Sequence, residues 1–173
     1  SVTFSEAVYN ISNGSGALEA SDFTLSISGG TALVNSTPSS ISVSGNVYTL
    51  GLNLTNTPDG AETVTVVPSS STAIYDASGN AASTSQSNNT VSLNDQTSPT
   101  ITGTTVASNN STISVTFSEA VYNTSSGSGA LEASDFTLSI SGDDLCINPI
   151  PSAISSSGNN YILEAEIIGK PKW

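Results

Sequence analysis

A long internal duplication constrains the fold of this chain more than any other feature. Residues 1–29 (SVTFSEAVYNISNGSGALEASDFTLSISG) recur at residues 114–142, so the offset from Ser1 to Ser114 is 113 residues. The two copies differ at only two positions, Ile11/Thr124 and Asn13/Ser126. A match of this length at one offset is typical of a tandem array. The 173 residues therefore suit two unequal modules better than one large domain.

Apolar residues alternate with Ser, Thr and Asn along most of the chain, and this period of two predicts strands with one buried face. The expected inward rows are Val2 and Phe4, with Ile113, Val115 and Phe117 in the second copy; Phe23, Leu25 and Ile27, with Phe136, Leu138 and Ile140; and Tyr48, Leu50, Leu52 and Leu54, with Tyr161, Leu163, Ala165 and Ile167. Further strands are expected through Val64 and Val66 past Pro68 to Ile74, at Val91 and Leu93, and from Ile101 to Val106. No segment has a convincing helical period.

The number and spacing of these strands predict an all-β fold. About seven short strands per repeat are typical of immunoglobulin-like Greek-key β-sandwich modules, here in tandem with a period of about 113 residues. Residues 1–95 are expected to form a module that lacks its first strand, residues 96–99 a linker, and residues 100–173 a second module that lacks its last two strands. The sixth strand is central in its sheet, so its absence would leave backbone groups unpaired. We therefore predict that another chain completes the second module by strand addition or swapping, or that this module is poorly ordered.

The charge of the chain is strongly one-sided. It has 14 Asp and Glu residues, and its only basic residues are Lys170 and Lys172, which gives a formal net charge of −12. A polyanion would be repelled by such a surface, so nucleic acid is excluded as a partner. Two explanations of the acidity stay open: a solvated surface that keeps a secreted protein soluble, or carboxylates grouped around divalent cations.

Several functional classes conflict with the composition. The chain has no histidine, which excludes Ser–His–Asp and Cys–His nucleophilic sites and His-based zinc sites. No glycine-rich phosphate loop ends in lysine, and short strands joined by short turns offer no obvious cleft for a pair of catalytic carboxylates. Cys146 is alone, and no run of 18 apolar residues predicts a membrane span. We expect neither enzymatic activity nor a disulfide within the chain.

Four motifs occur in a fixed order: VTFSEAV (2–8), LEASDFTLS (18–26), IYDASGN (74–80) and NDQTSPTI (94–101). Together they resemble the bacterial immunoglobulin-like tandem repeats of large secreted adhesins and surface-layer-type proteins. The resemblance covers nearly the whole chain and is weakest over residues 143–173. It implies a sandwich fold, an extracellular or cell-surface location, and a role as a stalk, spacer or adhesive segment whose partners are neighbouring repeat modules. In some relatives of this kind Ca²⁺ stiffens the junction between modules.

The predicted loops place oxygen ligands at the ends of the modules, where a hard cation could bind six to eight of them. At one end of the first module we expect Glu6, from the loop after the second strand of the sandwich, to lie near Asp76 and Asn80, from the loop before its last strand. Asp59 of the first module, Asp95 of the linker and Glu119 of the second module are expected at the junction. Ordinary turn chemistry is the alternative for each of them, because Asp and Asn side chains cap tight turns. We expect Asp22 and Asp135, just before a strand, to bond to the backbone in the same way.

Other functions remain open to the sequence. A carbohydrate-binding accessory module of a secreted enzyme would need a solvent-facing row of aromatic residues, whereas the alternation places most aromatics inside. Ice binding by a flat threonine array has only a hint in Thr63/Thr65 and Thr102/Thr104, because the spacing is not sustained. The sequence identifies no glycan or surface ligand of the array.

Overall fold

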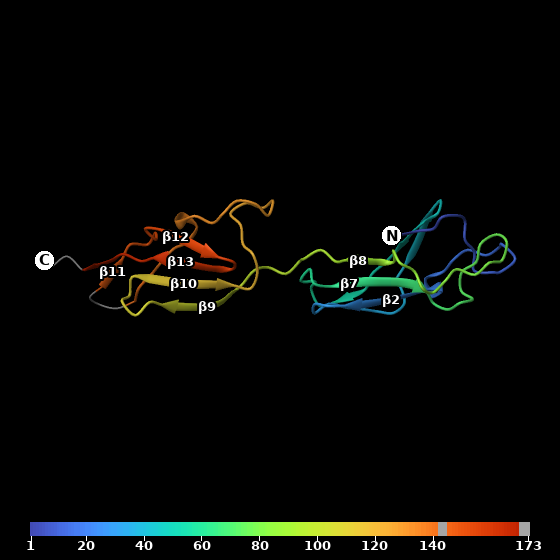
Figure 1. Cartoon of the computed structure of the whole chain (residues 1–173), viewed down its shortest axis with the longest axis horizontal. Coiled ribbons are helices and arrows are strands. Elements are labelled where there is room, and N and C mark those ends of the chain that lie inside the picture. Colours follow the sequence, from blue (N-terminus) through green and yellow to red (C-terminus); the bar gives the residue numbers. More distant parts are fainter. Residues whose placement is uncertain (142–144, 170–173) are drawn as a thin grey trace. The chain divides into compact units, whose positions relative to one another are not determined.

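The structure is a computed structural model that describes residues 1–141 and 145–169. It divides into two compact units, unit 1 (Ser1–Thr97) and unit 2 (Ser98–Trp173), and the boundary falls within the predicted 96–99 linker. Both units consist of short strands in antiparallel sheets, which confirms the all-β prediction (Figure 1). Among the described residues the helical segments are two single turns of 3₁₀-helix, Ala20–Asp22 and Ala133–Asp135. No described helix has the length and apolar character that a membrane crossing requires.

Unit 1 contains three small antiparallel sheets. In the first sheet β1 (Val2–Thr3) and β4 (Ile41–Ser44) flank β5 (Val47–Leu50). In the second, β2 (Phe23–Ser28) and β8 (Thr90–Ser92) flank β7 (Thr63–Pro68), and the third pairs β3 (Leu33–Val34) with β6 (Leu54–Thr55). β2 pairs with β7 along its whole length, from Phe23↔Pro68 to Ser28↔Thr63.

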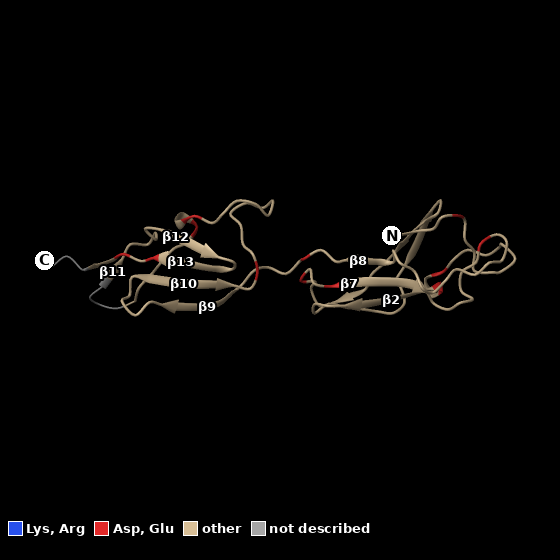
Figure 2. Ribbon diagram, viewed as in Figure 1, with Lys and Arg blue, Asp and Glu red and all other residues tan. Residues whose placement is uncertain are grey.

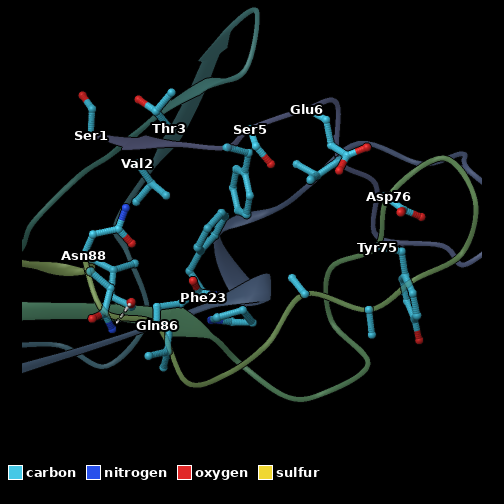
Figure 3. Close-up of a pocket in the computed structure, with 18 of the residues that line it drawn as sticks. Ser1, Val2, Thr3, Ser5, Glu6, Phe23, Tyr75, Asp76, Gln86 and Asn88 are labelled. Carbon is cyan, nitrogen blue, oxygen red and sulfur yellow. Dashed lines mark hydrogen bonds between the residues drawn. The ribbon is translucent and has the colours of Figure 1, made fainter.

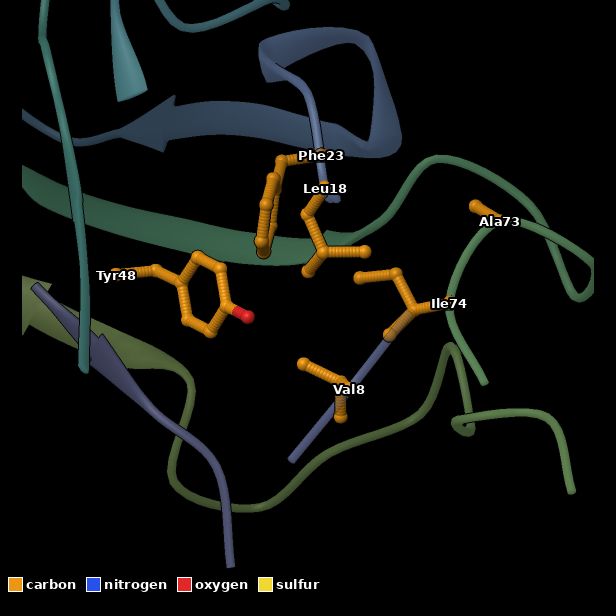
Figure 4. Packing of buried hydrophobic residues seen from close by; sticks show 6 residues of the cluster. All are labelled: Val8, Leu18, Phe23, Tyr48, Ala73 and Ile74. Carbon is orange, nitrogen blue, oxygen red and sulfur yellow. The ribbon is translucent and has the colours of Figure 1, made fainter. Parts of the chain in front are cut away.

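The core of unit 1 lies between the β1–β5–β4 sheet and the β2–β7–β8 sheet. Phe23 from β2 and Tyr48 from β5 pack with residues of two connecting segments, one between β1 and β2 and one between β7 and β8 (Figure 4). The cluster consists of Val8, Leu18, Phe23, Tyr48, Ala73 and Ile74. Phe23 and Leu25 are buried as their alternation predicts, each at 2 % exposure. Apolar faces of two sheets that pack around one core are consistent with a β-sandwich.

Unit 2 contains a four-stranded sheet in the order β12 (Ile154–Ser157), β13 (Asn160–Glu164), β10 (Thr112–Phe117), β9 (Ile101–Val106). A second sheet pairs β11 (Leu145–Ile147) with β14 (Ile167–Gly169). The predicted Ile101–Val106 strand is thus confirmed. β9 pairs with β10 from Ile113↔Val106 to Phe117↔Ile101, and the register shifts at Thr116/Phe117, which marks a β-bulge.

The two units build the same cluster of three aromatic rings. In unit 1 the ring centroids of Phe4 and Tyr48 lie 5.6 Å apart at an interplanar angle of 90°. Their counterparts in unit 2, Phe117 and Tyr161, lie 5.7 Å apart at 86°. The third ring, Phe23 or Phe136, lies 6.2 Å from the tyrosine ring in each unit. The three rings therefore pack in the same way in both units, although Phe23 lies in a strand and Phe136 does not.

One predicted strand is wrong in the second copy. Phe136, Leu138 and Ile140 do not form a strand, although their residues repeat Phe23, Leu25 and Ile27. Phe136 is only half-buried and Ile140 is 40 % exposed. In unit 1 the segment is held as β2 by the full ladder with β7, and residues 136–140 have no such ladder in the described part of unit 2. Leu138 keeps only the backbone bond from its N–H to Pro149 O, 2.8 Å, which corresponds to the bond from Leu25 N–H to Ser36 O.

Two further predicted strands end earlier than the alternation suggests. The Tyr48–Leu54 row is broken after Leu50, because the chain leaves β5 and re-enters strand structure as β6 in a different sheet. The equivalent row in unit 2 breaks in the same way between β13 and β14. β7 ends at Pro68 and does not continue to Ile74. The bond from Ser69 N–H to Asp22 O, 2.8 Å, is the last one between this strand and the β2 side, and the chain then enters a turn in which Ala73 N–H bonds Ser70 O at 3.3 Å.

Candidate functional site

A cavity of about 690 Å³ opens along the edge of unit 1 between β1 and the β8 side of the second sheet (Figure 3). Its floor includes the core rings Phe4 and Phe23, and its rim carries polar groups. Three predicted metal ligands, Glu6, Asp76 and Asn80, line it together. The structure thus brings side chains separated by about seventy residues of sequence to one place.

Asp76 is held by a tight turn. Its Oδ1 accepts hydrogen bonds from the backbone N–H groups of Ser78 and Asn80, both at 2.8 Å, and its Oδ2 accepts one from Asn80 Nδ2 at 2.7 Å. These donors stabilise the carboxylate, and they lower the pKa of Asp76 below its usual value of 3.8, with the Asn80 side chain contributing most. The turn reading of D-A-S-G-N is confirmed, and Glu6 stays exposed beside it.

Asp59 and Asp95 belong to two segments that meet at a different place in unit 1, where Gln96 N–H bonds Pro58 O at 2.9 Å. The Cβ that a side chain at Gly60 would add lies 3.1 Å from the Cβ of Asp95. Asp59 Oδ1 accepts the N–H of Ala61 at 3.0 Å, and Asp95 Oδ1 accepts the N–H of Thr97 at 2.8 Å. Both carboxylates therefore cap short turns, as Asx chemistry predicts.

A buried carboxylate next to these two residues is the main anchor of this end of unit 1. Glu62 has 0 % exposure. Its Oε1 accepts the N–H groups of Thr31 at 3.0 Å and Ala32 at 2.9 Å, and its Oε2 accepts those of Asp59 at 3.1 Å and Gly60 at 3.2 Å. The backbone donors, Ala32 first, outweigh burial and lower the pKa of Glu62 below its usual 4.5. One ionised side chain thus joins the β2–β3 loop to the β6–β7 loop.

The sequence did not single out Glu62. It stands alone before the apolar-alternating run of β7, and a carboxylate there is normally a solvated strand-end residue. Its partners Thr31 and Ala32 lie about thirty residues away in the chain. The only local signal is the D-G-A-E order, in which Gly60 adopts a positive φ of 81° and presents its N–H to the carboxylate.

Glu119 lies in unit 2 and Asp95 in unit 1, so their predicted meeting at a junction stays a prediction. Asp and Glu residues are spread along the ribbons of both units (Figure 2). In the described part of the chain no three Asp, Glu, His or Cys side chains come together as a group that could hold a metal ion. The Glu6–Asp76–Asn80 set combines two carboxylates with one amide, fewer ligands than the six to eight that Ca²⁺ takes. Calcium binding by the six predicted residues stays a prediction.

No protein-family model, no curated protein and no solved structure matches the chain.

Proposed function

We propose that this chain is a structural or adhesive repeat segment, a stalk or spacer, of a secreted or cell-surface protein, built from immunoglobulin-like modules in tandem. The observation that supports the proposal most is the repeated scaffold. Both units carry the same three-ring cluster and the same 3₁₀ turn, in which Glu19 and Glu132 have φ values of −113° and −112°. A stalk or spacer is built by repeating one module in tandem. A domain with a specific binding site can work as a single copy.

The last residues of unit 1 are hydrogen-bonded to the body of the unit, as a segment that carries tension would need. The backbone N–H of Gln96 and the hydroxyl of Thr97 both donate to Pro58 O, each at 2.9 Å. Pro58 lies in the loop that Glu62 anchors through Asp59. Tension on the chain after Thr97 would therefore reach the body of unit 1 through this hydrogen-bonded loop.

The carbohydrate-binding alternative receives less support. Most aromatic rings pack against one another within their unit and do not form a solvent-facing row. These rings are Phe4, Phe23 and Tyr48 in unit 1, and Phe117, Phe136 and Tyr161 in unit 2. Among the described residues Tyr122 is the one aromatic residue whose side chain is largely exposed, at 51 %. A single tyrosine makes a poor platform for a glycan chain, which stacks on several rings.

Force spectroscopy tests the spacer proposal. We expect unit 1, when the full chain is pulled from both termini between marker domains, to unfold in one step. Its residues Ser1–Thr97 would release up to about 350 Å of contour length. The antiparallel β2–β7 ladder must shear or unzip in that step, so a distinct force peak is expected. Extension of this chain without any peak, beside normal peaks from the marker domains, would contradict a load-bearing role.

Thermal unfolding tests the calcium prediction. If the six residues bind Ca²⁺ with the affinity usual for extracellular modules, 10 mM Ca²⁺ should raise the unfolding midpoint by about 5–15 °C over a chelator control. If Ca²⁺ binds beside Glu6, the Asp76→Asn variant should lose most of this rise in the unfolding midpoint. If Ca²⁺ binds at the junction, the Asp95→Asn variant should lose it. Equal midpoints with Ca²⁺ and with chelator would remove calcium from the proposal and leave the spacer role intact.

A further inference from the structure

Eight asparagines of this chain begin the motif Asn-X-Ser/Thr, in which X is not proline. The motif is the acceptor sequence for N-linked glycosylation, which in secreted proteins occurs in surface loops. Because the motif is short and the chain is rich in Ser and Thr, its presence alone does not identify a site. The structure must show which asparagine a glycosyltransferase can reach. The eight are Asn10, Asn13, Asn35, Asn53, Asn88, Asn109, Asn110 and Asn123.

In two of the eight motifs the hydroxyl of the third residue bonds the asparagine side chain. Ser111 Oγ donates to Asn109 Oδ1 at 2.8 Å, and Ser111 N–H donates to the same oxygen at 3.1 Å. Ser15 Oγ donates to Asn13 Oδ1 at 2.5 Å. Among the described residues no other motif has this bond to its own asparagine, and the Nδ2 atoms of Asn13 and Asn109 donate to no protein acceptor. Both amide nitrogens are therefore available for a new bond.

Asn109 lies at the tip of the hairpin that joins β9 to β10 (Figure 1). The turn is closed by two backbone bonds, from Asn110 N–H to Ala107 O at 2.8 Å and from Ala107 N–H to Thr112 O at 3.0 Å. Asn110 has a φ of 58°, in the left-handed region that asparagine tolerates. Residues 108–111 are all exposed. The hairpin therefore holds the Asn109 side chain in solvent in a defined conformation.

Asn13 has less free space, because its loop lies against another turn. A Cβ added at Gly14, the next residue, would lie 2.9 Å from Ala77 O. A sugar on Asn13, and the enzyme that attaches it, would have to pass this second segment. Asn109 is thus the better acceptor of the two.

Two other motifs continue into strands. The third residue of the Asn110 motif is Thr112, which is paired with β13 in the four-stranded sheet. The third residue of the Asn53 motif is Thr55, which is paired with β3. A transferase must hold all three residues of the motif in its own active site, whereas a strand ladder keeps the third residue in the sheet. These asparagines are exposed, but their motifs are less accessible than that of Asn109.

We propose that Asn109 is a site of N-linked glycosylation, an inference that rests on the proposed secretion of the chain. The co-reactant is a sugar that is activated as a phosphate ester at its anomeric carbon. Asn109 Nδ2 forms a bond to that carbon, and the bond from the carbon to the phosphate oxygen breaks. The phosphate leaves with the electron pair, and one Nδ2 proton passes to a base of the transferase. No group is oxidised or reduced in this step.

Ser111 favours the transfer because both of its donors lie on Asn109 Oδ1. An amide nitrogen is a weak nucleophile, since its lone pair is delocalised into the carbonyl group. As a base removes the Nδ2 proton, negative charge collects on Oδ1, and donors that are already in place stabilise this charge without reorganising. Ser111 is therefore a positioning residue for Asn109 in the folded hairpin.

Sugar transfer to the folded full chain tests the choice of asparagine. The chain is incubated with UDP-glucose and a soluble glucosyltransferase that recognises Asn-X-Ser/Thr, and fragmentation mass spectrometry locates the added glucose. We expect glucose on Asn109, with at least about tenfold less on Asn53 and on Asn110. Equal transfer to all three asparagines, or transfer to Asn110 in place of Asn109, would overturn the proposal.

Substitutions in the hairpin test the role of the hydroxyl. Ser111→Ala should lower glucose transfer to Asn109 at least about tenfold, whereas Ser111→Thr keeps a hydroxyl and should retain the transfer. Ser108→Ala is the matched control, because Ser108 is exposed in the same turn and lies outside the motif. Transfer to Asn109 that is unchanged by Ser111→Ala, or lowered equally by Ser108→Ala, would overturn the proposal.

Protein recovered from the cells that produce it shows whether the site is used. Peptide mapping by mass spectrometry should find a sugar on Asn109, and an unmodified Asn109 would overturn the proposal. The same preparation tests the proposed secretion separately, because it shows whether the protein lies outside or inside the cells. Protein outside the cells with an unmodified Asn109 would remove the glycosylation and leave the spacer role intact.

Discussion

Glu62→Gln is expected to lower the thermal unfolding midpoint of unit 1 on the order of 10 °C. The Glu62 carboxylate is fully buried and accepts the N–H groups of Thr31, Ala32, Asp59 and Gly60. A glutamine keeps the shape but replaces one acceptor oxygen by an NH₂ group, which then faces backbone donors. Circular dichroism gives the midpoint, and hydrogen exchange at Thr31 and Ala32 shows whether the β2–β3 loop has come loose. Glu6→Gln, at an exposed carboxylate, is the control and should change little.

The same carboxylate gives unit 1 a defined acid sensitivity. Backbone donors lower the pKa of Glu62 in the folded state below its usual 4.5. A group with a lowered folded-state pKa stabilises the fold above its unfolded pKa, and this stabilisation is lost as the pH falls from about 4.5 through the folded value. Glu62→Gln should therefore flatten the fall in midpoint below pH 4.5. An unchanged acid profile in the variant would show that other groups, such as Asp76, carry the dependence.

Gly30→Ala is expected to cost unit 1 about 3 kcal/mol or more of unfolding free energy. Gly30 has φ of +52°, and an added Cβ would lie 2.2 Å from the carboxyl carbon of Glu62 and 2.7 Å from Asp59 Oδ1. The Glu62 side chain would have to leave its backbone donors to make room. Aspartate, which stands at the equivalent position 143 of the second copy, should be worse still, because it adds a negative charge beside Glu62.

Gly45 separates backbone strain from the steric clash. It has a similar φ of +59°, but a Cβ there meets nothing within 4 Å. Gly45→Ala should therefore cost only the strain of the left-handed conformation, about 1–2 kcal/mol. Urea unfolding of the two variants gives the comparison. If Gly45→Ala and Gly30→Ala lower the unfolding free energy of unit 1 equally, the clash with the Glu62 carboxylate adds nothing to the cost of the backbone conformation.

Much of the fold follows from residue patterns. Alternation predicted the all-β class and the burial of Phe23 and Leu25, and β9 begins and ends where the pattern places it. Hydrogen bonds between a side chain and the nearby backbone could also be predicted from the sequence. Asp22 and Asp135 accept the N–H groups of Glu19 and Glu132 at 2.7 and 2.8 Å, as expected of acidic residues that precede a strand.

The candidate site was predictable only in part. The order of the loops in the predicted sandwich was enough to place three residues at one end of the first module. These residues, Glu6, Asp76 and Asn80, line one cavity. Glu62 could not be found, because its role depends on two distant loops that close over it. The cavity itself was also unforeseen, because the residues of β1 and β8 that line it together lie far apart in the sequence.

The repeated segment F-T-L-S-I-S separates what sequence determines from what tertiary structure decides. In both copies the sequence determines the alternation, the preceding 3₁₀ turn and the aromatic cluster. At residues 23–28 it is strand β2, and its counterpart that begins at Phe136 is not a strand. The difference lies in β7, whose backbone satisfies that of β2 across six residue pairs. A strand exists only where a neighbour accepts its hydrogen bonds, and that neighbour is supplied by the fold.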